Sequence, residues 1–282
     1  MIWAIFTSVV FACSNLFIRF YLANTHWLSL IWWRSLASSF ILVIMVFSWY
    51  SHHEIEAFIA QMILQKRLWS FTLIAGFIGI LGFIKAIKSL PLYAVIPFTT
   101  LNLVALGVSH FYLTIPVTWQ QLVGIVTGMV GLSLIYQNQH SIQNRSGWAW
   151  LLITVVCWGI SYPLSQPLIR SSSPLFFATS MEVVIAIGST ILFIAGKPDW
   201  KNNIQYSRPK PAQYIILVTL LVLGVLGNGF ARYGVSPIAM LAFSGFSEIG
   251  LLTASHFLFN ESMKPIHWTG ALLTILAMFL VF

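Results

Sequence analysis

Residues 28–50 read LSLIWWRSLASSFILVIMVFSWY, an apolar run with a single formal charge at Arg34. A bilayer hydrocarbon core of ~30 Å needs about 20 such residues at a helical rise of ~1.5 Å each. Backbone amides and carbonyls cannot stay unpaired in lipid, so a segment that crosses it forms a helix. The run therefore predicts a membrane-spanning α-helix.

The same pattern recurs along the whole chain. Nine further apolar runs of spanning length are expected at 2–22, 69–88, 91–113, 118–136, 147–168, 174–195, 212–233, 236–259 and 265–282. The runs are too long and too continuous for the strands of a membrane barrel, which alternate over about 10 residues. The expected fold class is an all-α membrane protein with ten transmembrane helices.

Composition agrees with a protein whose main solvent is lipid. Of its 282 residues, 59% are hydrophobic and 7% are charged, whereas soluble domains carry roughly 25% charged residues. The basic residues that give a net charge of +8 are scattered over loops and helix ends, which favours anchoring at lipid headgroups over nucleic acid binding. Cys13 and Cys157 lie inside apolar runs, so neither indicates a disulfide framework or a metal site. We expect an integral protein of the plasma (inner) membrane.

The linker between the second and third runs has a pattern of its own. Residues 51–67 read SHHEIEAFIAQMILQKR, and their apolar members follow helical spacing: Ile55, Phe58, Ile59, Met62 and Ile63. This pattern predicts a short amphipathic helix that lies in the membrane interface.

An internal repeat divides the chain at an offset of 146 residues. Three matches share this offset: Pro91 with Pro237, Gly124 with Gly270, and Ser109-His110-Phe111 with Ser255-His256-Phe257. Each unit then holds five helices, and this odd number makes the second unit enter the membrane from the opposite side. We expect two inverted five-helix repeats, residues 1–140 and 146–282, with a site at the midplane between them.

Short motifs in the second unit resemble a known family. Phe259-Asn260-Glu261 forms a corner before His267-Trp268-Thr269-Gly270-Ala271, and Cys157-Trp158-Gly159 lies in the sixth run. Together with the five-plus-five arrangement, these residues resemble the EamA-type carriers of the drug/metabolite transporter superfamily over essentially the whole chain. The resemblance implies an acidic residue about a dozen positions before the corner, where Glu248 lies. Ile115 and Cys13-Ser14 depart from the family pattern in the first unit.

The repeat and the resemblance favour a secondary transporter that moves a small organic metabolite or drug by alternating access. The alternative is a membrane-embedded enzyme or a channel without a recognisable catalytic motif. An enzyme is disfavoured because the single aspartate, Asp199, lies in a linker and neither a GxSxG motif nor a phosphate-binding loop is present. The expected partners are the lipid bilayer, the substrate and a coupling proton, with no nucleic acid, no cofactor and the chain acting as a monomer.

Eight residues are predicted to line the substrate site: Arg34, Asn102, His110, Trp158, Tyr162, Glu182, Glu248 and His256. Ionisable groups inside spanning helices cost ~2.5–3.5 kcal/mol on insertion scales, so they usually face a cavity or a partner. Substrate binding, proton coupling and pairing with an arginine are all open for Glu182 and Glu248. For Arg34, snorkelling to the interface is the favoured interpretation.

Two of these predictions depend on the repeat. Asn102 lies at the position that matches Glu248, which suggests two walls of one cavity or simple interhelical hydrogen bonding. His110 matches His256, and a pair of histidines can hold haem or a metal. Without further ligand-rich motifs, helix packing or cavity lining is the favoured role of both histidines, and no metal site is expected.

Membrane orientation is a point on which two arguments disagree. More of the basic residues lie on the side opposite the N-terminus, and the positive-inside rule then places both termini outside. The family resemblance implies that both termini lie in the cytoplasm, and we follow the resemblance.

Overall fold

A computed structural model describes residues 2–22, 24–90, 95, 103–112, 114, 116, 118–137, 145–195, 210–234, 256–257 and 264–281. Within these residues the chain is helical and contains no strand. The helices are α1 (Ile2–Tyr21), α2 (Trp27–Trp49), α3 (His52–Leu64), α4 (Lys66–Ser89), α6 (Leu103–Phe111), α7 (Trp119–Gln137), α8 (Arg145–Ser171), α9 (Pro174–Ala195), α11 (Pro211–Gly234) and α13 (Pro265–Val281).

Six of the described helices are long and apolar enough to cross a membrane: α1, α2, α4, α8, α9 and α11. Their bounds lie within three residues of the spans predicted from the sequence. The predicted span at 91–113 is described only at 95 and 103–112, where it contains α6, and the span at 236–259 only at 256–257. The all-helical class and the integral membrane character of the protein are therefore confirmed.

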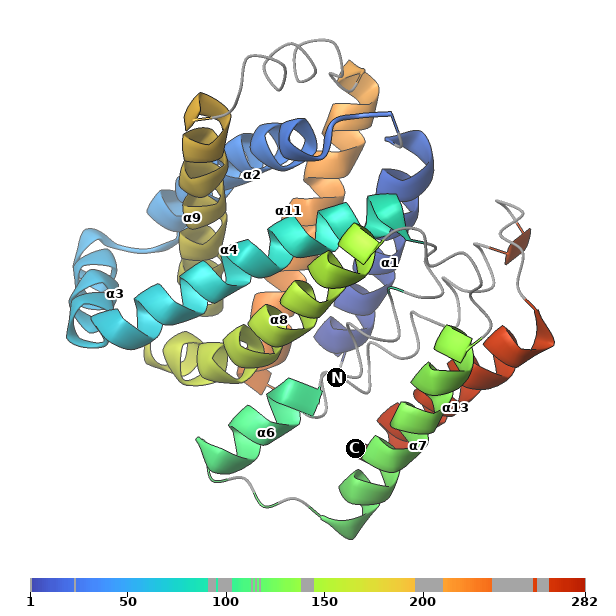
Figure 1. The fold of residues 1–282 in the computed structure, drawn as a ribbon. Helices are drawn as coiled ribbons and strands as arrows, with labels where there is room; N and C mark the ends of the chain where they lie inside the picture. Colours follow the sequence, from blue (N-terminus) through green and yellow to red (C-terminus); the bar gives the residue numbers. More distant parts are fainter. Residues whose placement is uncertain are drawn as a thin grey trace.

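The helices pack in pairs that join the first part of the chain to the second. The principal pairs are α1 with α11, α2 with α9, α4 with α8, and α7 with α13. In Figure 1, α7 and α13 run side by side at one edge of the molecule, beside the larger group of helices. Every principal pair thus brings together segments that lie far apart in the sequence.

Two apolar clusters hold the larger group of helices together. One surrounds Leu30 and Ile31 of α2 and Ile84 and Ile87 of α4, all of which are fully enclosed by protein. The other surrounds Trp69 of α4, whose ring packs against Phe176 and Phe177 of α9. Lipid supplies no hydrophobic force between helices, so close packing of this kind is what stabilises the bundle.

Glycines allow the closest helix contacts. A Cβ atom at Gly82 of α4 would lie 2.7 Å from the carbonyl oxygen of Trp150 in α8. A Cβ atom at Gly131 of α7 would lie 2.6 Å from the carbonyl oxygen of Gly270 in α13. These positions admit no side chain because two backbones meet there, as is common in membrane helix pairs.

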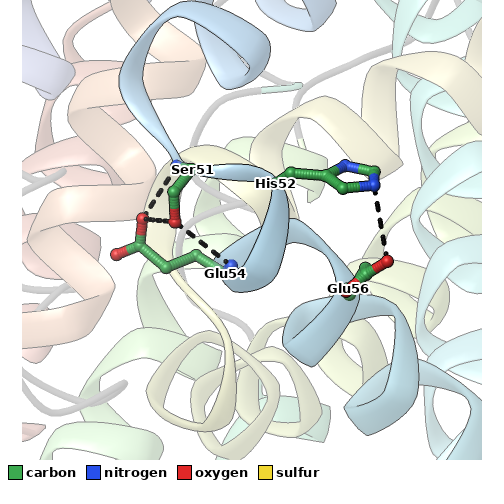
Figure 2. Close-up of polar contacts among 4 residues, drawn as sticks. All are labelled: Ser51, His52, Glu54 and Glu56. Atoms are coloured by element: carbon green, nitrogen blue, oxygen red, sulfur yellow. Dashed lines mark hydrogen bonds and ion pairs between the residues drawn. The ribbon is translucent and has the colours of Figure 1, made fainter.

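The predicted amphipathic helix is present as α3, and Figure 2 shows how it begins. The Ser51 amide and hydroxyl both donate to Glu54 Oε2 at 2.8 Å, and the Glu54 amide donates to Ser51 Oγ at 3.4 Å. This reciprocal arrangement is a capping box, which satisfies amides that a helix start leaves unpaired. His52 and Glu56 face each other one turn apart at 3.4 Å.

The predicted apolar face of α3 is divided in the structure. Ile55 is buried, and Phe58 and Met62 pack against the cluster around Trp69. Ile59 and Ile63 are exposed on the outside of the protein. The helix therefore docks by one edge and presents another apolar edge outward.

Helix α8 contains two prolines, Pro163 and Pro167, and a proline inside a helix kinks or breaks it. The helix is continuous through both of them, and Figure 1 shows that it changes direction along its length. A proline removes one backbone hydrogen bond and crowds the preceding turn, so a bend without a break is the expected result.

Candidate functional site

A ladder of polar side chains joins α2 to α9. Its rungs are four hydrogen bonds: Trp32 Nε1 to Thr190 Oγ1 at 3.0 Å, Ser35 Oγ with Ser189 Oγ at 3.4 Å, Ser38 Oγ to Glu182 Oε2 at 2.7 Å, and Thr179 Oγ1 to the Leu42 carbonyl at 3.5 Å. Residue numbers rise along α2 as they fall along α9, so the two helices run antiparallel. We call these residues the α2–α9 ladder.

Glu182 and Arg34 place two opposite charges in this ladder. Their side chains are 2% and 3% exposed, and they interact electrostatically. The Arg34 Nε atom is enclosed and makes no hydrogen bond. The snorkelling interpretation of Arg34 is wrong, because the side chain lies inside the helix bundle and not at its surface. Two charges buried at this depth are costly unless each compensates the other or meets a ligand.

A second polar group lies between α8 and α11, around Arg232. The guanidinium carbon of Arg232 lies 3.7 Å from the ring centroid of Tyr162. Arg232 Nη1 donates to Ser165 Oγ at 2.6 Å, and Arg232 Nε donates to Asn228 Oδ1 at 3.1 Å. We call these four residues the Arg232 cluster.

Trp158 continues this cluster along α8. Its ring lies 6.1 Å from that of Tyr162 and 4.8 Å from that of Phe83 in α4. Gly79 makes room for the indole, since a Cβ atom there would lie 2.3 Å from Trp158 Cδ1. The structure therefore brings the predicted site residues together in two pairs, Arg34 with Glu182 and Trp158 with Tyr162.

Comparison with known proteins identifies the family. Residues 145–282, from the start of α8 onward, match the model of the EamA-like transporter family. Residues 145–282 belong to the EamA-like transporter family. The predicted membership of the drug/metabolite transporter superfamily is thereby confirmed. The matched segment contains Glu182 and the whole Arg232 cluster.

Solved structures support the fold over nearly the whole chain. One of them, described only as the crystal structure of a protein, has a TM-score of 0.66 and 10% sequence identity, and covers 98% of this chain and 94% of that chain. At this identity the likeness concerns the fold alone. No curated protein matches the sequence.

The remaining predicted site residues of the transporter are more dispersed. His110 is exposed in the last turn of α6, and the His256 ring stands edge-on to Trp268 at 5.6 Å. Asn102 and Glu248 lie outside the described residues. Among the described residues, no group of three or more histidine, cysteine or acidic side chains could hold a metal ion.

Sequence reasoning missed the hydroxyl groups of the ladder and of the Arg232 cluster. Ser35, Ser38, Ser165 and Ser189 are all buried inside spanning helices. A signal was present, because Ser35 and Ser38 recur at a spacing of three residues directly after the charged Arg34. Single serines in apolar runs usually bond back to their own helix, so this spacing alone did not indicate a site.

Lys88 and Arg19 bind backbone carbonyls at helix ends. Lys88 Nζ donates to the carbonyls of Leu22, at 2.8 Å, and Thr25, while Arg19 Nη1 donates to the Ile87 carbonyl at 2.8 Å. Cations favour the carbonyl-rich C-terminal ends of helices. Positive charge gathers in the same region, and it affects His26. Burial, followed by repulsion from Lys88 and Lys85, lowers the pKa of His26 below its ordinary value.

Proposed function

We propose that this EamA-like transporter is a secondary carrier that moves a small organic solute by alternating access. The observation that carries the proposal is the family match over residues 145–282. The expected setting is the plasma (inner) membrane, with no catalytic chemistry.

The helix pairing supports two inverted units, residues 1–140 and 146–282. At the 146-residue offset, α1 corresponds to α8, α2 to α9, α4 to α11 and α7 to α13. Exchanging each helix for its counterpart turns the α1–α11 pair into α8–α4, which also exists. The α2–α9 and α7–α13 pairs turn into themselves. A two-fold axis in the membrane plane would produce this set of pairs, and such an axis underlies alternating access in many carriers.

The α2–α9 ladder is the proposed centre of the transport pathway. A pair of helices that exchange with each other lies on the axis relating the two units, where carriers place their sites. Arg34 and Glu182 supply charges there, and Trp158 and Tyr162 of α8 are proposed to supply aromatic surface. Asn102, His110, Glu248 and His256 remain proposed lining residues.

Glu182 or Glu248 is proposed to carry a coupling proton. Both acids belong to segments that the sequence predicts to span the membrane, where a carboxylate is stable only with a cation or a donor nearby. Glu182 has a donor in Ser38, at 2.7 Å, and a cation in Arg34. Protonating Glu182 would remove the negative charge that balances Arg34. Proton uptake would therefore weaken the electrostatic attraction between α2 and α9 in the ladder.

Counterflow in proteoliposomes tests the proposal. The vesicles hold the purified transporter and a panel of labelled amino acids, organic acids and organic cations. Saturable counterflow of any of these solutes supports a carrier, whereas non-saturable flux indicates a channel and chemical turnover indicates an enzyme.

Three variants locate the coupling. Glu182→Gln and Glu248→Gln should each abolish transport or remove its pH dependence if that acid carries the proton. Glu56→Gln is the matched control, because Glu56 is exposed on α3. Wild-type rates at every pH for both of the first two variants would contradict the proposed coupling.

A further inference from the structure

Helix α3 exposes apolar side chains on the outside of the protein. Ile59 and Ile63 are 41% and 61% exposed, and Leu64, the last residue of the helix, is 77% exposed. We call these three residues the outer surface of α3. Apolar side chains grouped in this way mark a surface that contacts something apolar.

The outer surface continues the apolar side by which α3 packs on the protein. Ile55 is buried there, and Met62 packs against the cluster around Trp69. With 3.6 residues per helical turn, Ile59 and Ile63 follow Ile55 and Met62 directly around the helix. The protein therefore covers one half of a single apolar stripe and leaves the other half open.

The helices that α3 connects indicate that lipid covers the open half. Phe47 and Trp49 are exposed at the end of α2, and Phe71 and Ile74 are exposed in the first turns of α4. Both helices are long and apolar enough to cross a membrane, so these side chains face lipid tails, which are equally apolar. Figure 1 shows α3 at a steep angle to α4, as expected for a helix that lies along the membrane surface.

Three exposed cations border the site where α3 docks. Lys66 and Arg67 begin α4, directly after α3, and Arg170 lies in the last turn of α8. Arg67 precedes Trp69 by two residues, and Arg170 directly follows Ile169, a buried member of the same apolar cluster. Positive charge therefore lies beside the apolar stripe.

The acids of α3 lie at its other end and have partners within the helix. Glu54 accepts hydrogen bonds from the amide and the hydroxyl of Ser51, and Glu56 faces His52 at 3.4 Å. The helix thus begins with acidic residues and is followed by basic ones. Its basic end is complementary to an anionic membrane surface.

We propose that the outer surface of α3 and the three cations Lys66, Arg67 and Arg170 bind anionic phospholipid. The acyl chains cover the outer surface, and the cations contact the lipid phosphates, in the leaflet on the side where α2 ends. Apolar residues of an interfacial helix enter the boundary between headgroups and acyl chains. Each Lys or Arg near an anionic lipid surface contributes roughly 5-fold in affinity. The proposal depends on the membrane-spanning character of the chain and not on the solute that it carries.

Bound lipid would stabilise the bundle through Phe58 of α3. The Phe58 ring lies 5.3 Å from the ring of Phe176, near the start of α9, and 5.2 Å from that of Tyr50, directly after α2. Lipid that holds α3 in place therefore also holds one end of the α2–α9 pair. Anionic lipid should raise the melting temperature of the protein.

Lipid titration of the purified, full-length protein tests the proposal. The probes are phosphatidylglycerol, phosphatidylcholine and glycerol phosphate, which carries the phosphate without acyl chains. Phosphatidylglycerol should raise the melting temperature at a concentration at least about 10-fold lower than phosphatidylcholine does. High salt should reduce this preference, because it screens exposed charges. In nanodiscs, phosphatidylglycerol should slow hydrogen exchange of α3 amides relative to α2 amides.

Variants then assign the preference to the basic residues. The double variant Lys66→Gln/Arg67→Gln should lose most of the preference for phosphatidylglycerol. Arg145→Gln/Lys210→Gln is the control, since it removes two exposed cations elsewhere, at the starts of α8 and α11. Ile63→Ser should weaken the effects of both lipids alike, because it removes apolar contact and leaves the charges in place.

Equal stabilisation of the wild type by the two lipids would overturn the proposal, as would an unchanged preference in the Lys66→Gln/Arg67→Gln variant. An equal loss of preference in the control would also overturn it, because net charge would then be the cause. If glycerol phosphate matched phosphatidylglycerol, the surface would be a site for soluble anions and not for lipid. Failure of the carrier proposal looks different: counterflow would be absent while the lipid preference remained.

Discussion

Replacing Ser38 by alanine tests whether the α2–α9 ladder stabilises the bundle. Ser38 Oγ donates to Glu182 Oε2 at 2.7 Å, and the two side chains are 0% and 2% exposed. The substitution leaves the carboxylate in place but removes a hydrogen-bond donor that no water can replace. The variant should therefore be less stable than the wild type.

The size of the effect follows from the charge and the burial of this bond. Hydrogen bonds to charged groups contribute about 1.5–3 kcal/mol in soluble proteins. Polar bonds between membrane helices average ~0.6 kcal/mol and reach ~1.7 kcal/mol. Because Glu182 is enclosed by protein, we expect Ser38→Ala to lower the free energy of unfolding by about 1–2 kcal/mol.

Reversible unfolding in mixed micelles measures this difference, with Ser48→Ala as the matched control. Ser48 lies on the same helix, but its hydroxyl is exposed and donates to the Ile44 carbonyl at 2.8 Å. Ser48→Ala should change the unfolding free energy by less than about 0.5 kcal/mol. Equal effects of the two substitutions would refute the reasoning. A Ser38→Ala effect that did not shrink in a Glu182→Gln background would refute it as well.

Two further predictions concern helix contacts and pH. Gly82→Leu should prevent α4 from reaching α8, because a Cβ atom there already lies 2.7 Å from the Trp150 carbonyl oxygen. Gly107→Leu is the control, since a Cβ atom at Gly107 would have no heavy atom within 4 Å. The yield of folded protein after detergent extraction should fall for the first variant and not for the second. Hydrogen bonds from the backbone amide and then the hydroxyl of Ser51 hold the pKa of Glu54 below its ordinary value. The start of α3 should therefore lose protection from hydrogen exchange as the pH falls through this lowered pKa. A Glu54→Gln variant with the same acid-side loss, relative to α2 amides, would contradict this.

The helices themselves could be predicted because lipid allows few alternatives. A run such as 28–50 must pair its backbone internally, so its length and polarity alone predict a helix close to Trp27–Trp49. The family could be predicted for a similar reason, since corner motifs and the repeat are local or evenly spaced features of the sequence. Glu182 could be predicted as a candidate site residue because a carboxylate in an apolar spanning run costs free energy and therefore requires a partner.

The partners of these residues could not be predicted. Arg34 was expected to snorkel because a single helix offers no alternative, and only its packing against α9 encloses it. Ser38 and Ser165 carry no distinguishing pattern, because each also donates to a carbonyl of its own helix, as serines in helices commonly do, and its partner on another helix is set by packing. The sequence determined which segments are helices and which residues are costly in lipid, because both depend on local composition. The partners of these costly residues depend on tertiary packing, because Arg34 meets Glu182 only where α2 packs on α9, and Arg232 donates to Ser165, 67 positions away, only where α11 packs on α8.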